Sequence, residues 1–506
     1  MTGVQNESWW VASTQATAFP PHAGEPTAEV AVLGGGIAGL TTAYLLAKEG
    51  RDVLLVEAAR IAEGVSGYTT AKVTVQHSLI YADLESRHGA EAARTYADSQ
   101  SAALQWIRDT VAREGIECEL ESVASLVYTE SEDERSKVDA EVMAAVAAGL
   151  DARLVADADL PYGFVAGARM EGQAQFHPRK YLLALAATFV AAGGRIVEQT
   201  RALDVGKGSP CVVTTEHGTI RADQVVVATH YPFLDRGGLF ARLAPYRDVV
   251  VAAPVPAASA PQLIAISTGA EEGGVHSVRT APYRDGERLL VITGGQYKTG
   301  TTSEVEVRYD GLEAWATERF GVSNFAYRWS AQDTSSVDRL PYIGKLPLSG
   351  DNVFVATGFS AWGMTNGTLS GMVLADLLAG RDNPWAALYD PSRADVRASA
   401  SKGVKEGASV AKEMVGGMFR RYKGSADDVA PGQAAVYRGP GGRTAAYREK
   451  DGTLHCVSAK CTHMGCTVAW NDAERSWDCP CHGSRFDHTG AVLQGPAVKP
   501  LGPVEP

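Results

Sequence analysis

The sequence predicts an α/β fold built on a parallel sheet, joined to a mixed helix-and-sheet part and followed by a small all-β domain. Three observations lead to this prediction. A strand–glycine loop–helix–strand pattern fills residues 29–57, β-branched and aromatic residues are frequent over 245–335, and short segments separated by Gly and Pro begin at about 431. A chain of 506 residues is too long for one core, so several domains are expected.

Composition and charge are those of an ordinary globular protein, with 45% hydrophobic and 21% charged residues. The net charge of −12 disfavours nucleic acids and anionic membranes as partners. The sequence has no apolar run of about 18 residues, so no membrane span is expected. The N-terminus lacks the basic and apolar regions of a secretory signal, which predicts a cytoplasmic location.

The first functional motif is a glycine-rich loop between a predicted strand and a predicted helix. Residues 29–34 read EVAVLG, and the loop GGGIAG overlaps the end of this strand. Gly34, Gly36 and Gly39 have the spacing of the GxGxxG fingerprint. In this fingerprint the glycines allow a tight turn, the close approach of a pyrophosphate and close helix–strand packing. The loop therefore predicts a dinucleotide site.

The residues on either side of the loop fit the same site. The helix begins at Ile37 and Ala38, where unpaired backbone N–H groups face a bound phosphate. The second strand, DVLLVE, ends at Glu57, where an acidic side chain accepts hydrogen bonds from ribose hydroxyls. We expect Ile37, Ala38, Glu57 and Ala58 to contact the cofactor.

The fingerprint alone fits NAD as well as FAD, and two later segments favour FAD. QVVVATH (224–230) has the pattern of a strand that returns to the nucleotide fold and brings Thr229 to the cofactor. NVFVATGFSAWGMTNGTLSG (352–371) places a helix start after a buried strand, where it stabilises negative charge on a reduced flavin. The expected contacts there are Gly358, Trp362, Gly363, Met364 and Thr365. The alternative is a glycine-rich turn with a packing role only.

With GVSGYTTAKVTVQH (64–77) and SVDRLPYIG (336–344), these segments resemble the D-amino-acid oxidase/glycine oxidase-like FAD oxidoreductases over about residues 28–390. The resemblance implies a Rossmann-type FAD-binding fold of the D-amino-acid oxidase/glutathione-reductase kind, with an α+β substrate domain. It also implies that the segment after the second strand passes the pyrophosphate and the flavin. The implied contacts are Arg60, Thr69, Thr70, Ala71 and Lys72. TTAK departs from the small Ser, Ala and Gly residues usual in the family.

The domain plan follows from these patterns. We expect an N-terminal extension over 1–27, an oxidoreductase domain over 28–395, a helical linker over 396–430 and a β domain over 431–506. Within the oxidoreductase domain, the nucleotide-binding parts are expected at about 28–75, 150–235 and 335–390, and the substrate parts at about 76–150 and 236–334.

The second functional motif is a pair of cysteine- and histidine-containing loops near the C-terminus. CTHMGC (461–466) and CPCHGS (479–484) each offer cysteine and histidine. A Rieske [2Fe–2S] centre holds one iron by two Cys and the other by two His. The predicted ligands are Cys461 and Cys479 for one iron, and His463 and His482 for the other. A Cys₂His₂ zinc site is the alternative; the paired loops and the short strands around them favour the cluster.

These loops resemble those of Rieske proteins over about residues 430–506. The resemblance implies a disulfide between Cys466 and Cys481, with two free thiols as the alternative in a reducing cytosol. It also implies that Ser484 donates a hydrogen bond to a bridging sulfide. A tyrosine that often donates a second bond is replaced by Phe486. We therefore expect a reduction potential below that of the respiratory Rieske proteins.

The two cofactors together predict an oxidoreductase, because a flavin accepts a hydride and a Rieske cluster carries single electrons. The resemblance implies oxidation of a C–N bond of an amine or amino acid, with electrons passing from the flavin through the cluster to an external acceptor or O2. The alternatives are an NAD(P)H-driven reductase for a partner oxygenase and a biosynthetic tailoring oxidase. A Rieske oxygenase also needs iron held by two His and one carboxylate, and the sequence shows no closely spaced group of this kind outside the cluster loops.

Three side chains are candidates for catalysis. Gln332 and Asp333 lie in YRWSAQDTSS (327–336), just before the segment expected near the flavin. Capping of a strand is the alternative for both. Lys72 is the third candidate, with an ordinary surface lysine as the alternative.

Overall fold

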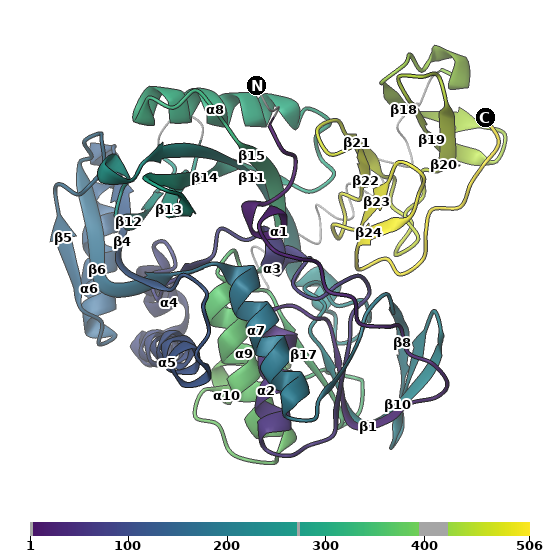
Figure 1. The fold of residues 1–506 in the computed structure, drawn as a ribbon, viewed down its shortest axis with the longest axis horizontal. Coiled ribbons are helices and arrows are strands. Elements are labelled where there is room, and N and C mark those ends of the chain that lie inside the picture. The colour runs from purple at the N-terminus through teal and green to yellow at the C-terminus, as the bar shows by residue number, and fades with distance from the viewer. Residues whose placement is uncertain (1–3, 271–273, 394–423) are drawn as a thin grey trace.

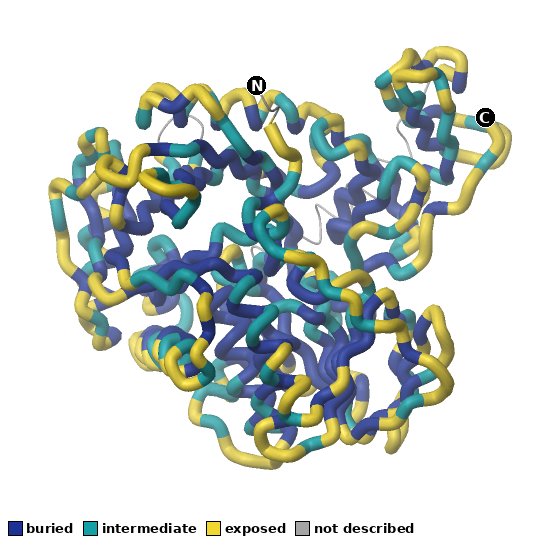
Figure 2. The backbone as a smooth tube through the Cα atoms, viewed as in Figure 1, coloured by how far each residue is buried: buried dark blue, intermediate teal, exposed yellow. Residues whose placement is uncertain are grey.

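The computed structural model describes residues 4–270, 274–393 and 424–506. Two large sheets form the main body, and a small β domain lies beside them (Figure 1). In Figure 2 the strands of both large sheets are mostly buried, whereas many of the outer turns are exposed. The predicted fold class is confirmed.

The first sheet is the predicted nucleotide-binding sheet. Its order is β16 (Tyr342–Lys345), β17 (Val353–Thr357), β10 (Gly218–Val227), β1 (Thr27–Leu33), β2 (Val53–Val56) and β7 (Arg195–Val197), with β8 (Ala202–Gly206) and β9 (Cys211–Thr215) attached through β10. The pairs from β17 to β7 are parallel. β2 and β17 are buried throughout, as expected for parallel strands covered on both faces.

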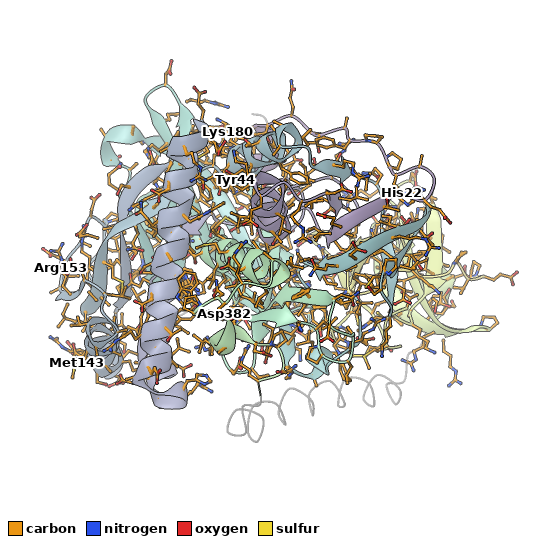
Figure 3. All side chains as sticks on the ribbon, turned by 90° about the horizontal axis from the view of Figure 1, so that it is seen from below. His22, Tyr44, Met143, Arg153, Lys180 and Asp382 are labelled. Carbon is orange, nitrogen blue, oxygen red and sulfur yellow. A yellow bond between two sulfur atoms is a disulfide. The ribbon has the colours of Figure 1, made fainter. Side chains whose placement is uncertain are left out.

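Three helices pack together beside this sheet: α2 (Ile37–Lys48), α7 (Pro178–Ala191) and α9 (Gly363–Leu378) (Figure 1). The long helix α5 (Ala90–Glu114) packs against α9. Figure 3 labels Tyr44 of α2, whose hydroxyl donates to Glu114 at the end of α5 (2.7 Å). The shorter helices are α1 (Trp9–Ala12), α3 (Val65–Tyr68), α4 (Ile80–His88) and α10 (Ala386–Tyr389), and single 3₁₀ turns lie at Glu132–Glu134, Leu239–Ala241, Ala257–Ser259 and Ala426–Asp428. Among the described residues, none of the helices is long and apolar enough to cross a bilayer.

The second sheet is mostly antiparallel and carries the expected substrate part. Its order is β15 (Tyr327–Ser336), β11 (Leu243–Pro256), β14 (Glu287–Lys298), β13 (Ser277–Arg284), β12 (Leu263–Ser267), β4 (Glu121–Thr129), β6 (Ala166–Gln175) and β3 (Lys72–Val73), with β5 (Ala152–Val155) paired to β6. Helix α8 (Glu306–Phe320) packs on β11 and β14, and α6 (Arg135–Ala147) packs on β5 and β6.

One expected boundary differs from the structure. Strand β6 pairs with both β4 and β5, so β5 and β6 belong to the second sheet, and the boundary expected at about 150 is too early. Figure 3 places Met143 of α6 and Arg153 of β5 at the outer edge of the molecule. The N-terminal extension packs against the oxidoreductase domain, since Trp10 is fully buried and its indole N–H donates to Thr69 O (2.6 Å).

The C-terminal domain consists of two antiparallel sheets. One contains β18 (Ala434–Gly439), β19 (Gly442–Arg448) and β20 (Leu454–Ser458), and the other contains β21 (Ala469–Asn471), β22 (Ser476–Asp478), β23 (Arg485–Asp487) and β24 (Val492–Gln494). Their shared core includes Trp477, Phe486 and the loop cysteines. Most of the expected helical linker, residues 396–423, lies outside the described residues.

Candidate cofactor sites and the interface between them

The glycine loop packs tightly against neighbouring backbone, as the dinucleotide fingerprint requires. Gly34 has φ +110°, and a Cβ there would lie 2.4 Å from Ala228 O. A Cβ on Gly39 would lie 1.9 Å from Gly34 O, so only glycine lets helix α2 pack this closely on the loop. Gly36 offers no side-chain cap to helix α2, and the Ile37 N–H, which was expected to be unpaired, donates to the Ser66 hydroxyl (3.1 Å). This geometry fits the pyrophosphate of a dinucleotide.

A cavity of about 1050 Å³ extends from this loop, large enough for FAD and a small substrate. Many of the sequence-predicted residues line it: Gly34, Gly36, Ile37, Ala38, Glu57, Ala58, Thr69, Thr70, Lys72, Thr229, Trp362, Gly363 and Met364. The predicted contacts that do not line it are Gly39, Arg60, Ala71, Gly358 and Thr365.

Three of the residues outside the cavity, Ala71, Gly358 and Thr365, make identifiable packing contacts instead. The Ala71 carbonyl accepts from Arg279 (2.7 Å), and the Thr365 hydroxyl lies 3.0 Å from His77 Nε2. A Cβ on Gly358, which has φ +79°, would lie 3.2 Å from Leu243. Sequence reasoning missed several lining residues, including Ser66, Arg201, His230 and Phe359. Ser66, His230 and Phe359 lay within recognised motifs, GVSGYTTAKVTVQH, QVVVATH and NVFVATGFSAWGMTNGTLSG, whereas Arg201 lay outside them.

Glu57 lies at the end of β2, as expected, and lines the cavity. Its carboxylate accepts hydrogen bonds from the backbone N–H groups of Gly35 (2.7 Å) and Ala59 (2.8 Å). Burial raises the pKa of Glu57 above its usual value, although these two N–H groups oppose the shift. The carboxylate therefore holds the glycine loop in place at the edge of the predicted ribose site.

Lys72 lies inside the cavity, so the surface-lysine alternative is wrong. Its side chain is 8% exposed, and Nζ donates to the hydroxyls of Thr70 and Ser277, each at 2.8 Å. Burial, together with the positive charge of Arg279, lowers the pKa of Lys72 to about 7. A substantial fraction of this amine is therefore neutral near pH 7 and able to accept a proton.

Gln332 and Asp333 point to opposite sides of β15, as neighbours in a strand do. Both residues line the cavity, and Asp333 Oδ1 lies 3.6 Å from His230 Nε2. The Gln332 amide donates to Gly483 O in the second cysteine loop (3.0 Å), and its oxygen accepts from Thr299 (3.1 Å). The structure thus places Gln332 against the predicted cluster site.

The two cysteine–histidine loops meet in the core of the C-terminal domain. The Cys461 and Cys479 thiols are buried and within hydrogen-bonding reach, and this contact lowers the pKa of Cys461 to about 6. The His463 and His482 rings lie 4.9 Å apart. His463 Nδ1 and both ring nitrogens of His482 are buried without a hydrogen-bond partner. Two thiols and two imidazoles with unpartnered nitrogens fit the ligand set of a Rieske cluster.

The loops are held together by side chains next to the ligands. Cys466 and Cys481 form a disulfide, with Cα atoms 6.5 Å apart. The Ser484 hydroxyl accepts a hydrogen bond from the Ala497 N–H (3.0 Å) and also forms a hydrogen bond with the Cys461 side chain. Phe486 is fully buried and offers no donor to the cluster.

The histidine side of this site faces the oxidoreductase domain. His463 Nε2 lies 2.9 Å from Asp235 Oδ1. The His482 ring lies 6.0 Å from the Tyr231 ring and 6.1 Å from the Phe240 ring. A Cβ on Gly300 would lie 2.6 Å from Pro480 N, so the backbones of the two domains are in direct contact. Figure 1 shows the sheet β21–β24 between β15 and the outer sheet β18–β20.

A buried ion cluster joins the two domains. The Arg247 guanidinium, 1% exposed, donates to both carboxylate oxygens of Glu474 (2.7 and 2.8 Å). Arg485 and Ser330 also bond to Glu474. Burial alone would raise the pKa of Glu474, but the charges of Arg247 and Arg485 outweigh it and lower the pKa to about 2. Glu474 and Arg485 also line the cavity, which is therefore shared by the two domains.

Replacing Glu474 with glutamine is expected to destabilise this interface by about 3–5 kcal/mol, because Arg247 then keeps a buried charge without its partner. Denaturant unfolding measures the loss. The double variant Arg247→Met/Glu474→Met is the control, since removing both charges recovers most of the stability. In the native protein this contribution is present above about pH 4.3 and is lost as the pH falls toward 2. Equal unfolding free energies for Glu474→Gln and the native protein would contradict this role.

Comparisons with known proteins show the family of each part of the chain. The family model described as FAD dependent oxidoreductase matches residues 29–377, and the model of the Rieske [2Fe-2S] domain matches residues 422–505. A Bacillus subtilis protein named as a Rieske 2Fe-2S iron-sulfur protein, YhfW, is 37% identical over 501 residues, which cover 99% of this chain and 97% of that protein. Iron-sulfur subunit 1 of the Synechocystis cytochrome b6-f complex is 38% identical over 105 residues, which cover 20% of this chain and 58% of that protein.

Solved structures show the same fold in the oxidoreductase part. Glycine oxidase from Geobacillus kaustophilus superposes with a TM-score of 0.59 at 20% identity, covering 73% of this chain and 99% of that chain. L-amino acid deaminase from Proteus vulgaris superposes with a TM-score of 0.59 at 16% identity, covering 75% of this chain and 100% of that chain.

Proposed function

Because the chain belongs to the FAD-dependent oxidoreductase family of the D-amino-acid oxidase type and carries a Rieske [2Fe-2S] domain, we propose that it oxidises a C–N bond of an amine or amino acid. In this proposal the electrons pass through the Rieske domain to an external acceptor or to O2. The proposed electron transfer from the flavin to the cluster rests on one observation. His463 and His482 contact residues 231–240 of the oxidoreductase domain. The cavity shared by both domains supports it.

Each predicted cofactor has a matching set of residues. When bound, FAD supplies a hydride acceptor and the [2Fe–2S] cluster supplies a one-electron carrier. The loop around Gly34 and Gly36 and the start of α2 would hold the pyrophosphate of FAD. Cys461, Cys479, His463 and His482 would hold the cluster.

Lys72 and Asp248, which both line the cavity, are suited to bind a cationic amine and remove a proton from it. An ammonium ion must lose a proton first, because the nitrogen lone pair forms the C=N bond as a hydride leaves the C–H bond of the neighbouring carbon. Lys72 Nζ is positioned to accept that proton, because its pKa of about 7 leaves part of it neutral. Asp248 lies in the same cavity, and burial raises its pKa to about 6. As an anion above this pH, Asp248 attracts a cationic amine.

Replacing Lys72 with methionine is expected to slow flavin reduction by about 100-fold, the lower range for loss of a positioned proton acceptor. In the native protein the rate should rise as the pH increases through about 7, because the neutral amine accumulates. The variant should lose this inflection. Anaerobic stopped-flow absorbance with an amine substrate measures both effects. Lys180→Met, at a partly exposed lysine paired with Glu119, is the control. A native inflection retained in Lys72→Met would exclude this role.

Asp235 is proposed to set the environment of the histidine ligand. A carboxylate that accepts from the Nε2–H of a metal-bound imidazole makes that ligand more basic and favours the oxidised metal. Asp235→Asn should therefore raise the reduction potential by roughly 60 mV, which corresponds to a tenfold change in the relative stability of the two redox states. A redox titration followed by EPR measures the shift. Asp204→Asn, at an exposed carboxylate paired with Arg236, should leave the potential unchanged. An unchanged potential in Asp235→Asn would show that this contact does not act on the cluster.

An anaerobic screen tests the proposed reaction as a whole. Amines and amino acids are added to the purified protein, and flavin bleaching is followed together with the EPR signal of the reduced cluster. We expect at least one amine or amino acid to bleach the flavin and then produce the cluster signal. Bleaching by NADH or NADPH but by no compound with an oxidisable C–N bond would replace this proposal with an NAD(P)H-driven reductase.

A further inference from the structure

A second group of metal-ligating side chains lies in the Rieske domain, outside both cluster loops. It consists of Glu449, His455 and His488. Glu449 follows β19, His455 lies in β20, and His488 lies in the turn between β23 and β24. The sequence showed no such group, because its members come together only when the two sheets of the domain pack.

The pairing of the strands explains why these side chains meet. His455 pairs with Tyr447 across β19 and β20, so both side chains lie on one face of this sheet. Tyr447 stacks on Trp470 of the other sheet at 4.7 Å and makes an edge contact with His488 at 5.6 Å. This packing brings the His488 turn over His455, with the two imidazole rings 4.8 Å apart.

The distances suit a shared ion. His455 Nε2 lies 2.7 Å and His488 Nε2 lies 3.8 Å from the same oxygen, Glu449 Oε1. One ligand atom from each residue lies within 4.8 Å of the other two. Ligand atoms of a tetrahedral zinc site lie roughly 3.4 Å apart, given metal–ligand bonds of about 2.0–2.2 Å. Small side-chain rotations would therefore bring all three atoms onto one ion.

An ordinary ion pair accounts for only part of this arrangement. A His455–Glu449 hydrogen bond leaves His488 Nε2 too far from that oxygen for a second bond. The side chains are 23%, 33% and 40% exposed for His455, His488 and Glu449, so an ion can enter from solvent and keep a water ligand. The neighbouring Cys456 thiol lies instead 3.8 Å from the Tyr437 hydroxyl. The donor set is therefore two imidazoles and one carboxylate.

We propose that Glu449, His455 and His488 bind a divalent transition-metal ion, separate from the [2Fe–2S] cluster. Two imidazoles favour zinc and its neighbours over magnesium or calcium, which prefer oxygen ligands. The cavity that accommodates the flavin site does not include these residues, so the ion stands apart from the C–N chemistry. It would link the β19–β20 hairpin to the β23–β24 turn and stabilise the domain.

Equilibrium dialysis of the full holoprotein against Zn²⁺ tests this site, with iron and zinc measured by elemental analysis. We expect one bound zinc per chain with the iron content unchanged, and a higher melting temperature. Glu449→Gln and His488→Ala should each weaken zinc binding more than about 100-fold, since even the loss of a residue that only supports a ligand costs 10–100-fold. His217→Ala, an exposed histidine of the oxidoreductase domain, is the control and should bind zinc normally.

Three results would overturn the proposal: no zinc uptake, equal zinc binding by the native protein and both variants, or zinc uptake matched by loss of iron. If Glu449→Gln folds poorly, zinc binding by His488→Ala alone tests the proposal. This variant is expected to fold, because His488 lies in a turn and its side chain is one-third exposed.

Discussion

Replacing Cys479 with serine is expected to abolish the iron–sulfur cluster and, with it, electron delivery to one-electron acceptors. Cys479 is buried beside Cys461 in the core of the Rieske domain, and a serine hydroxyl cannot replace the thiolate on iron. Iron content and the EPR signal should fall to background. Turnover with a one-electron acceptor should fall at least about 100-fold, or roughly 2.7 kcal/mol. Flavin bleaching by substrate should continue.

Cys456→Ser is the matched control, because Cys456 is a free cysteine of the same domain outside the two loops. It should keep the iron, the EPR signal and the turnover. Bound flavin must be measured in both variants, since the Rieske domain lines part of the cavity. Undiminished turnover in iron-free Cys479→Ser would show that the electrons leave the flavin without the cluster.

Replacing Gly39 with valine is expected to abolish FAD binding. The first carbon of the new side chain would lie 1.9 Å from Gly34 O, so helix α2 must move away from the loop that is predicted to hold the pyrophosphate. We expect the affinity for FAD to fall at least about 1000-fold, or roughly 4 kcal/mol. The purified protein should be colourless in the flavin region, and fluorescence titration with FAD measures the remaining affinity.

Gly311→Ala is the control for this change, because a Cβ at Gly311 in helix α8 meets no atom within 4 Å. That variant should keep its flavin and its melting temperature. Normal FAD content in Gly39→Val would mean that the cofactor binds elsewhere in the chain.

The sequence predicts best those features whose signals are local. The spacing of Gly34, Gly36 and Gly39 reflects contacts within one turn, and the structure shows the close approaches that the spacing implies. The two Cys–His loops are similarly short, so their residue types and spacing already indicate the ligand set. Strand β2 could be recognised because a continuous apolar run is typical of a buried parallel strand.

Features that depend on distant segments could not be predicted in the same way. Strand β6 contains few large apolar residues, and its place in the second sheet depends on pairing with β4 and β3. The direction of the Gln332 side chain follows from strand alternation, which a shift of one residue would reverse. The Arg247–Glu474 and Asp235–His463 contacts join separate domains, so neither partner indicates the other in the sequence.

The interface between the two domains holds the two predicted cofactor sites in a fixed relative position. The cluster loops contact the oxidoreductase domain through Asp235, Gln332 and the histidine rings, while Arg247 and Glu474 hold the domains together nearby. Buried charge pairs of this kind favour one geometry over others, because a displaced partner leaves an uncompensated charge. A fixed geometry would suit repeated electron transfer between the two sites.

Electron transfer from the flavin to the cluster is tested most directly by the rate at which the cluster is reduced after the flavin. Photoreduction of the flavin under anaerobic conditions, followed by absorbance and rapid-freeze EPR, resolves the two events without a known substrate. If the electrons pass within one chain, flavin reoxidation and the signal of the reduced cluster appear together, at a rate independent of protein concentration. A flavin that stays reduced beside an oxidised cluster, or a rate proportional to protein concentration, would contradict transfer within one chain.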